Sequence, residues 1–260
     1  MTTENEVDQL IEEEKKPWTE LTNEELEGPP TILLYGASGS GKTYLSGQFP
    51  NNLILACDPG PTGGAKSALL AHERLELKWD KPKIVKVTSY DQLMNLIPQL
   101  DPYAHREGGF DTITADSISY LQRIVMTNLL SKTGRETPRF EEWGLCVERM
   151  RNIINRLADF KCTTILTAVE QTQKDEYTQR IMGTPDLPGR LARELPQACD
   201  VVLRLYTVSS LDPSTGQDII KYRFQSTPDD TWMARDRTGI LPPRGDSNLE
   251  SFKELLKLTL

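Results

Sequence analysis

The sequence has few of the residues that build metal sites or disulfide frameworks. Its 260 residues include only two histidines and four cysteines. Neither His72 nor His105 has a ligand partner at a useful spacing, so we expect no metal or catalytic role for them. The cysteines form no CxxC pair, and three of them lie in or beside apolar runs. This usage indicates buried thiols in a reducing compartment and argues against a disulfide framework or a zinc site.

Long apolar runs and an excess of positive charge are also missing. No apolar stretch approaches the roughly 20 residues that a membrane span needs. The acidic N-terminus has no apolar centre, so we expect no secretory signal and a cytoplasmic location. The net charge of −8 disfavours a protein that coats duplex DNA by electrostatics alone, although a local basic channel remains compatible with it.

The first 29 residues differ from the rest of the chain and predict a partly flexible, acidic N-terminal arm. Residues 1–27 hold ten acidic residues against two lysines. A short helical pattern and Trp18 precede Gly28-Pro29-Pro30, a sequence that predicts a turn or loop. Two interpretations stay open: a disordered tail, or a strap that docks on a neighbouring subunit with Trp18 as its anchor.

From residue 30 onward, strand-like and helix-like segments alternate. The predicted strands are residues 31–35, 53–57, 84–87, 110–115, 163–169 and 201–206, with later antiparallel strands at 218–225 and near Trp232. A first helix begins over residues 42–48, and further helices are predicted at 89–100, 117–130, 141–160 and 248–258. Alternation of this kind predicts an α/β fold whose mostly parallel sheet is flanked by helices on both faces. We expect one core domain over residues 30–245 and a C-terminal helix over 246–260.

A glycine-rich turn after the first predicted strand matches the pattern GxxxxGK[ST], and a helix is predicted to follow it. Glycines allow backbone conformations that side chains block, so main-chain amides can converge on phosphate oxygens. The positive end of the helix dipole adds to this attraction. Lys42 would reach the β- and γ-phosphates, and the Thr43 hydroxyl would hold Mg²⁺. The residues expected to bind ATP are Gly36, Ala37, Ser38, Gly39, Ser40, Gly41, Lys42, Thr43 and Tyr44.

An acidic residue at the end of another strand would complete a magnesium–triphosphate site. Asp116 follows the apolar strand predicted at 110–115, at the sheet edge where α/β proteins bind ligands. We therefore expect Thr43 and Asp116 to hold Mg²⁺. The alternative is that Asp116 only caps the helix that follows.

The order of the strands bears on the type of reaction. Two predicted strands separate the glycine-rich turn from Asp116, which argues against the simplest nucleotide kinases and suggests a hydrolase in which an acid activates water. Asp58, at the end of the second predicted strand, is the leading candidate for that acid. Pro59-Gly60 after it also fits an ordinary turn, and Glu170, after the fifth strand, is the second candidate.

Several segments, in this order, resemble the RecA core. They are the glycine-rich turn, the second strand with its acid, "IVKVTSYDQLMNLI", "FDTITADS" and "TTILTAVEQTQ". The stretches "LLYGASGSGKTYLSGQFP" and "LARELPQACDVVLRLY" are especially similar to the compact phage RecA-like ATPases linked to single-strand annealing and recombination. The resemblance covers residues 31–242 and implies a RecA-like P-loop ATPase in the cytoplasm of a bacterial or phage-infected cell.

The resemblance also implies roles for individual residues. Asp58 stands where the family often has a catalytic glutamate, with a side chain one methylene shorter. Glu170 and Gln171 fall where the RecA core carries its γ-phosphate sensor, and Gln171 is the one expected to serve. Arg235 and Arg237 stand where RecA-like proteins often place a basic pair that reaches a neighbour's γ-phosphate, which would make the active unit a ring or filament. The alternative for this pair is a surface turn.

Two segments, residues 131–140 and 171–190, match the positions of RecA's mobile DNA-binding loops. Cations on such loops, together with an aromatic ring, suit single-stranded DNA, because they neutralise its phosphates and stack on its bases. Both segments also contain acids, so solvated surface loops are the alternative. The residues expected to bind DNA are Lys132, Arg135, Arg139, Lys174, Tyr177, Arg180 and Arg190.

These features predict an ATPase that needs ATP and Mg²⁺, is stimulated by DNA and forms a homo-oligomer. We expect it to act on single-stranded DNA in recombination or replication. Two other functions stay open: a phosphotransferase acting on a nucleoside or another small acceptor, and a nucleotide-dependent scaffold that does not hydrolyse ATP.

Overall fold

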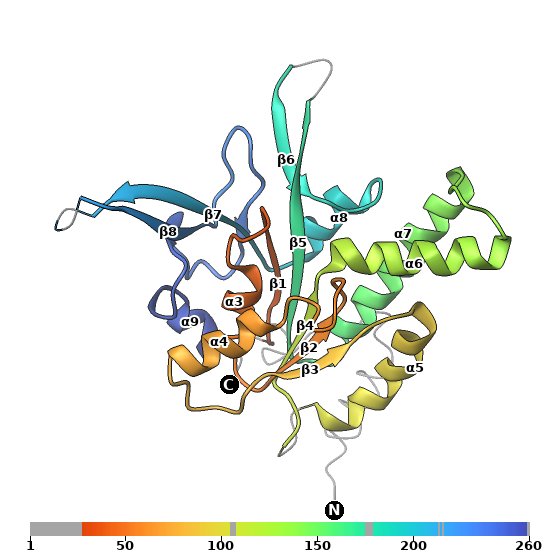
Figure 1. Cartoon of the computed structure of the whole chain (residues 1–260), viewed down its shortest axis with the longest axis horizontal. Coiled ribbons are helices and arrows are strands. Elements are labelled where there is room, and N and C mark those ends of the chain that lie inside the picture. The colour runs from red at the N-terminus through yellow and green to blue at the C-terminus, as the bar shows by residue number, and fades with distance from the viewer. Residues whose placement is uncertain (1–27, 105–107, 175–178, 213, 215, 259–260) are drawn as a thin grey trace, which may run out of the picture.

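A computed structural model describes residues 28–104, 108–174, 179–212, 214 and 216–258 (Figure 1). Residues 1–27 of the predicted N-terminal arm, including Trp18, lie outside the described residues, and so do His105 and Tyr177. Within the described part, a central sheet has helices on both faces and two long hairpins that project from it (Figure 1).

The sheet is mostly parallel, as the alternation of segments predicted. Its parallel strands are β1 (Thr31–Gly36), β2 (Asn52–Ala56), β3 (Lys83–Lys86), β4 (Thr112–Asp116), β5 (Thr163–Lys174) and β7 (Val201–Leu211), in the spatial order β7-β1-β5-β4-β2-β3. The late strands β8 (Asp218–Gln225), β9 (Arg235–Asp236) and β10 (Arg244–Asp246) are antiparallel. The α/β fold with late antiparallel strands is therefore confirmed, and the predicted strand near Trp232 forms three residues later, as β9.

The helices match the prediction less completely. They are α3 (Lys42–Ser46), α4 (Lys66–Arg74), α5 (Tyr90–Leu100), α6 (Ile118–Thr133), α7 (Phe140–Ala158), α8 (Leu191–Ala198) and α9 (Lys253–Lys257), with 3₁₀ turns at Asp101–Tyr103 and Glu250–Phe252. The prediction missed α4, which follows a glycine- and proline-rich stretch, and α8, which is short and contains Pro196. The C-terminal helix is shorter than predicted because its first turn is a 3₁₀ turn.

Alternate residues of the strands feed two hydrophobic cores, one on each face of the sheet. Leu33 and Tyr35 of β1 point to the face that α5, α6, α7 and α8 cover. Ile32 and Leu34 point to the opposite face, which α3 and α9 cover. This two-residue period is what an apolar strand buried on both faces produces. Packing on both faces holds β1 rigidly in the middle of the molecule.

Serine side chains begin two of the helices beside the carboxyl edge of the sheet. The Ser89 hydroxyl accepts a hydrogen bond from the Gln92 amide at 3.1 Å, while the Gln92 side chain accepts from the Thr88 amide at 2.8 Å. The two residues form a capping box in which the return bond comes from the Thr88 amide and not from the Ser89 amide. At α6 the N-cap is Ser117, so Asp116 does not cap this helix.

The four cysteines are buried and free, as predicted. Removal from water disfavours their thiolates, and burial raises the pKa of Cys146 to about 11 and the pKa of Cys199 to about 12. Thiols with such high pKa values are unreactive at neutral pH, so these residues serve the core.

The prediction that residues 171–190 form a mobile loop is wrong, because the segment contains paired strands. Strand β5 continues to Lys174 and pairs antiparallel with β6 (Ile181–Pro185), so most of this segment is a β-hairpin. The hairpin projects beyond the sheet (Figure 1). The outer residues of β5 are polar, and Ile181 and Met182 at the start of β6 are exposed, so the segment has no alternation of buried apolar and polar residues to reveal its strands.

The corner between α6 and α7 depends on the buried carboxylate of Glu142. One oxygen accepts from the Arg139 amide at 2.8 Å, and the other pairs with the Arg135 guanidinium at 2.5 Å. The hydrogen bond from the Arg139 backbone and the charge of Arg135 hold the pKa of Glu142 below its usual value. Arg135, predicted to bind DNA, is therefore engaged in holding this corner.

We predict that Glu142→Gln lowers the melting temperature at neutral pH by roughly 2–4 °C, because the ion pair is lost while the amide can still cap the helix. Since the pKa of Glu142 is lower in the folded chain than in the unfolded chain, its contribution is present above the unfolded pKa. It disappears as the pH falls through the folded pKa. Melting curves across this acidic range measure the difference, with Glu141→Gln, an exposed neighbour, as the matched control. A difference from wild type that is the same at every pH contradicts the prediction.

Candidate active site

The glycine-rich turn leaves β1 at the centre of the sheet and enters α3. Gly39 and Gly41 have φ angles of 80° and 94°, in the left-handed region that favours glycine. At Gly36 a Cβ atom would lie 2.1 Å from the carbonyl oxygen of Leu205, so the neighbouring strand β7 leaves no space for a side chain. The local sequence therefore determines a tight loop whose amides face the carboxyl edge of the sheet.

Lys42 lies folded over this loop. Its ammonium group donates to the carbonyl oxygens of Gly36 and Ala37, both at 2.9 Å. Burial lowers the pKa of Lys42, while the carboxylates of Asp116, Asp58 and Glu170 act in the opposite direction. Phosphate oxygens can replace these carbonyl oxygens without moving the lysine far, because both are anionic or partly anionic acceptors.

Thr43 and Asp116 meet directly below the loop. The Thr43 hydroxyl donates to one Asp116 oxygen at 2.8 Å, and the Thr167 hydroxyl of β5 donates to the other. Asp116 is buried, and desolvation raises the pKa of its carboxyl group against the effect of these two hydroxyl donors. The structure thus brings together the two residues that the sequence assigned to the metal.

This donor set fits magnesium. Mg²⁺ prefers oxygen ligands and commonly takes one or two from the protein, with phosphate and water supplying the others. A hydroxyl and a buried carboxylate provide such a pair. Across the described residues, no group of three or more His, Cys, Asp or Glu side chains gathers as an independent metal cage. The ion would therefore enter together with a triphosphate.

Asp58 lies at the same edge of the sheet, beside the start of α6. Its Oδ1 atom accepts hydrogen bonds from the Ser117 amide at 3.0 Å and from the Ser117 hydroxyl at 2.7 Å. Lys86 donates to its main-chain oxygen. The carboxylate lines the same cavity as Lys42 and Asp116, so its orientation is fixed toward the site.

The other predicted catalytic residues do not line this cavity. Glu170 pairs with Arg204 at 3.1 Å, and the Arg204 guanidinium stacks on Trp232 at 3.4 Å from the ring centroid. Gln171 donates to the Pro185 carbonyl oxygen at 3.1 Å, across the base of the β5–β6 hairpin. Both side chains are held by the hairpin base.

Arg235 and Arg237 lie at the opposite end of the sheet. Both donate to the Gln197 carbonyl oxygen, at 3.1 Å and 2.7 Å. Strand β9 pairs with the first residues of β7, so this turn is at the amino edge, whereas the glycine-rich loop is at the carboxyl edge. The pair therefore cannot reach the cavity of its own chain.

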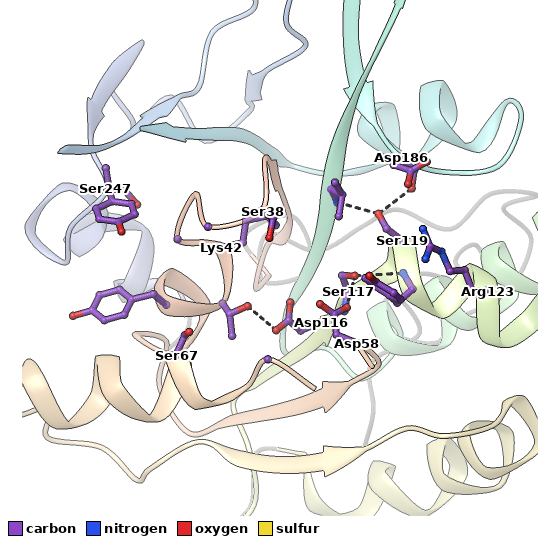
Figure 2. Close-up of a pocket in the computed structure, with 18 of the residues that line it drawn as sticks. Ser38, Lys42, Asp58, Ser67, Asp116, Ser117, Ser119, Arg123, Asp186 and Ser247 are labelled. Carbon is purple, nitrogen blue, oxygen red and sulfur yellow. Dashed lines mark hydrogen bonds between the residues drawn. The ribbon is translucent and has the colours of Figure 1, made fainter. Parts of the chain in front are cut away.

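The cavity has a volume of about 820 Å³ and extends well past the loop. Figure 2 shows Lys42 on one side and Arg123 on the other, with Asp116, Asp58 and Ser117 between them. The sequence analysis missed Arg123 and Asp186. No spacing in the sequence marks Arg123, which reaches the cavity from α6.

Ser119 was also missed, although it connects α6 to the projecting hairpin. Its hydroxyl donates to the Asp186 carbonyl oxygen at 2.9 Å and accepts from the Val169 amide at 3.0 Å (Figure 2). Val169 is on β5 just before the hairpin, and Asp186 comes just after it. The hairpin base is therefore tied to the helix that begins at the site.

The residues predicted to bind DNA are spread over three places and do not form one patch. The Nζ atom of Lys132 is 3.9 Å from Oδ1 of Asp91, and the Nε atom of Arg190 is 3.7 Å from Oε1 of Glu194. Lys174 ends β5 on the projecting hairpin, and Arg180 immediately precedes β6. Arg139 is the N-cap residue of α7.

Comparison with known families agrees with this geometry. A family model described as "AAA domain" matches residues 29–238. Among the curated proteins, the chain has no match. No helix in the described part of the chain has both the length and the apolar character needed to cross a membrane.

We predict that Lys42→Ala abolishes detectable triphosphate binding, at least a hundredfold loss of affinity, while the melting temperature changes little. Within the described part of the chain, the hydrogen bonds of the ammonium group go to Gly36 and Ala37 of its own loop, so we expect the fold not to depend on it. Isothermal titration with ATP and Mg²⁺ measures the loss. Lys66→Ala, an exposed lysine on α4, is the matched control. Unchanged ATP affinity in Lys42→Ala would overturn the assignment of the loop.

Proposed function

The chain belongs to the AAA-domain family of P-loop NTPases. We propose that it hydrolyses ATP with the help of Mg²⁺ and that this hydrolysis is coupled to single-stranded DNA. The observation that carries the hydrolase proposal is the contact between Thr43 and Asp116 beneath the glycine-rich loop. It supports a site for a metal-bound triphosphate beside a fixed carboxylate, Asp58.

In the proposed reaction, the loop amides and Lys42 hold the triphosphate, and Thr43 and Asp116 hold Mg²⁺. When bound, Mg²⁺ supplies charge neutralisation of the phosphate oxygens. Lys42 exchanges its two carbonyl contacts for phosphate oxygens and so brings a positive charge to the transferred group. Thr167 keeps Asp116 oriented from β5.

Asp58 is the proposed general base. Ser117 holds one of its oxygens through two hydrogen bonds, which leaves the carboxylate directed into the cavity. From there it can accept the proton of a water molecule that attacks the γ-phosphate. The Asp58 side chain is one methylene shorter than the glutamate that RecA-like proteins often have here, so we expect slow turnover.

Arginine from a neighbouring subunit would complete the site. Arg235 and Arg237 are remote from their own cavity, at the amino edge of the sheet. In a ring or filament they would lie against the next copy, where a guanidinium can stabilise the charge that develops on the transferred phosphoryl group. This proposal makes the active unit a homo-oligomer.

The proposed partner is single-stranded DNA, in a recombination or replication role like that of the RecA-like proteins. The β5–β6 hairpin supports it, because this arm starts at Val169 beside the cavity and carries Lys174 and Arg180. RecA binds DNA through mobile loops. In this proposal the corresponding element is a hairpin whose two strands are paired by main-chain hydrogen bonds.

The direct test is ATP hydrolysis measured with and without single-stranded DNA, with the assembly state followed in parallel by light scattering. We expect slow basal turnover, stimulation by the single strand, and assembly in the presence of ATP. Hydrolysis without any response to DNA would remove the DNA part of the proposal, and binding without hydrolysis would indicate a scaffold.

A phosphotransferase is the second candidate. The cavity continues past Asp58 to Arg123, which leaves space for a small acceptor opposite the glycine-rich loop (Figure 2). Phosphorylation of a nucleoside that does not depend on DNA would favour this function over hydrolysis.

We predict that Asp58→Asn lowers the rate constant of hydrolysis about a hundredfold or more and leaves ATP affinity within about threefold of wild type. The amide can still accept from Ser117, so the start of α6 keeps its hydrogen bonds. Steady-state kinetics and titration with ATP separate the two effects, with Asp80→Asn as an exposed control. Full turnover in Asp58→Asn would show that Asp58 is not the base.

We predict that Arg235→Ala reduces turnover tenfold or more without weakening ATP binding, because its guanidinium acts on a neighbouring copy. Mixing this variant with Asp116→Asn should restore part of the activity, since mixed assemblies contain intact sites. Hydrolysis is measured across mixing ratios after assembly has been confirmed. If no ratio restores activity, the arginine does not act between subunits.

A further inference from the structure

A second cavity lies beside the first, along one side of α6. Its volume is about 490 Å³, and it shares Asp58, Tyr120 and Arg123 with the first cavity. The segments that follow β2 and β3 form one wall, and the outer face of α6 forms the other. We call it the α6 groove. Its volume is within the range of sites that hold one small ligand.

Two tyrosines that line the α6 groove are each covered by an arginine. The Arg123 guanidinium lies 4.6 Å from the ring centroid of Tyr120, and Arg149 lies 4.6 Å from that of Tyr90. Arg149 is also fixed by a 2.8 Å hydrogen bond to Asn128. Rings held in this way present rigid aromatic surface, and a planar base can stack on an aromatic ring or on a guanidinium.

The uncompensated charge of the α6 groove is positive. Arg123 is exposed, and none of the ion pairs found among the described residues includes it. The charged residues that line the groove are the carboxylate Asp58 and the two cations Lys86 and Arg123, so the lining is cationic on balance. In a chain with a net charge of −8, a guanidinium left without a carboxylate partner at the mouth of two cavities suits an anionic ligand.

Polar side chains of the groove can complete such a ligand's contacts. Thr127 is exposed on the face of α6 one turn after Arg123 and lines the α6 groove. Lys86 extends from the opposite wall and donates to the Asp58 carbonyl oxygen. Aromatic surface, a free guanidinium and hydroxyl groups are together the donor set that recognises a base with its phosphate.

We propose that the α6 groove binds a nucleotide unit, that is, a planar base with its phosphate, either free or within a single strand. The phosphate pairs with Arg123 and the base stacks on the tyrosines. The inference rests on the proposed function in that the occupant is the nucleic-acid or nucleotide partner of the ATPase. It gives that partner a place different from the projecting hairpin.

The groove and the ATP site share a wall, so an occupant affects both. Asp58 lines the two cavities, and Ser117, which orients its carboxylate, begins the helix that carries Arg123. A ligand that draws Arg123 toward the groove also removes a cation from the end of the ATP cavity. Occupation of the groove therefore changes the charge opposite Lys42.

The test measures binding of two probes, a short fluorescein-labelled oligothymidylate and dTMP, to the full chain saturated with a non-hydrolysable ATP analogue and Mg²⁺. The analogue blocks the glycine-rich loop, so either probe must bind elsewhere. We expect Arg123→Gln and Thr127→Glu each to weaken binding at least tenfold. Arg193→Gln, an exposed arginine on α8 that lines neither cavity, should bind as wild type does.

The outcomes separate the sources of the ligand. Weakened binding of the oligonucleotide alone identifies a single strand, and weakened binding of dTMP alone identifies a free nucleotide. The proposal is overturned if neither probe binds wild type, or if both variants bind as wild type does while melting normally. ATP hydrolysis by wild type is measured separately, so loss of the groove leaves the ATPase proposal standing, and a wild type without hydrolysis leaves the groove standing.

Discussion

The hydrogen bond between Thr43 and Asp116 is the contact on which the site depends. Strand β5 lies between β1 and β4 in the sheet, so the loop after β1 must pass over the end of β5 to reach the acid of β4. Two strand spacings amount to roughly 10 Å, which a loop with side chains at its tightest points could not cross so closely. The left-handed glycines Gly39 and Gly41 let the loop turn tightly, and the absence of a Cβ at Gly36 lets β1 lie against β7 where the loop begins. Lys42 and Asp58 line the same cavity at the carboxyl edge as the Thr43–Asp116 pair.

Sequence reasoning found the parts of this arrangement that depend on local pattern. The buried strands, the glycine-rich turn and the acid after β4 each have a periodicity or a fixed spacing that one sequence reveals. The same reasoning expected a helix over residues 89–100 and another after Asp116, where α5 and α6 are found. These features are set by neighbours along the chain, so no knowledge of the tertiary structure was needed.

The remaining features depend on contacts between distant segments. The outer part of the β5–β6 hairpin is exposed to solvent and lacks apolar alternation, so only the ladder of main-chain hydrogen bonds distinguishes its strands from a loop. Glu170 follows a strand as an active-site acid would, yet Arg204 of β7 neutralises it. Arg123 and Asp186 belong to the cavity because α6 and the hairpin base meet there, and no spacing in the sequence records that meeting.

Trp232 closes the base of the hairpin. Its ring lies where a Cβ of Gly183 would be, at 2.0 Å, and Arg204 stacks on it while pairing with Glu170. Both hairpin strands are thereby clamped to the body of the protein at one level, and Ser119 clamps them again from α6. Two attachments at its root fix the hairpin to the helix that begins at the site and to β7. The rim of the cavity at Val169 and Asp186 is therefore a preorganised part of the fold.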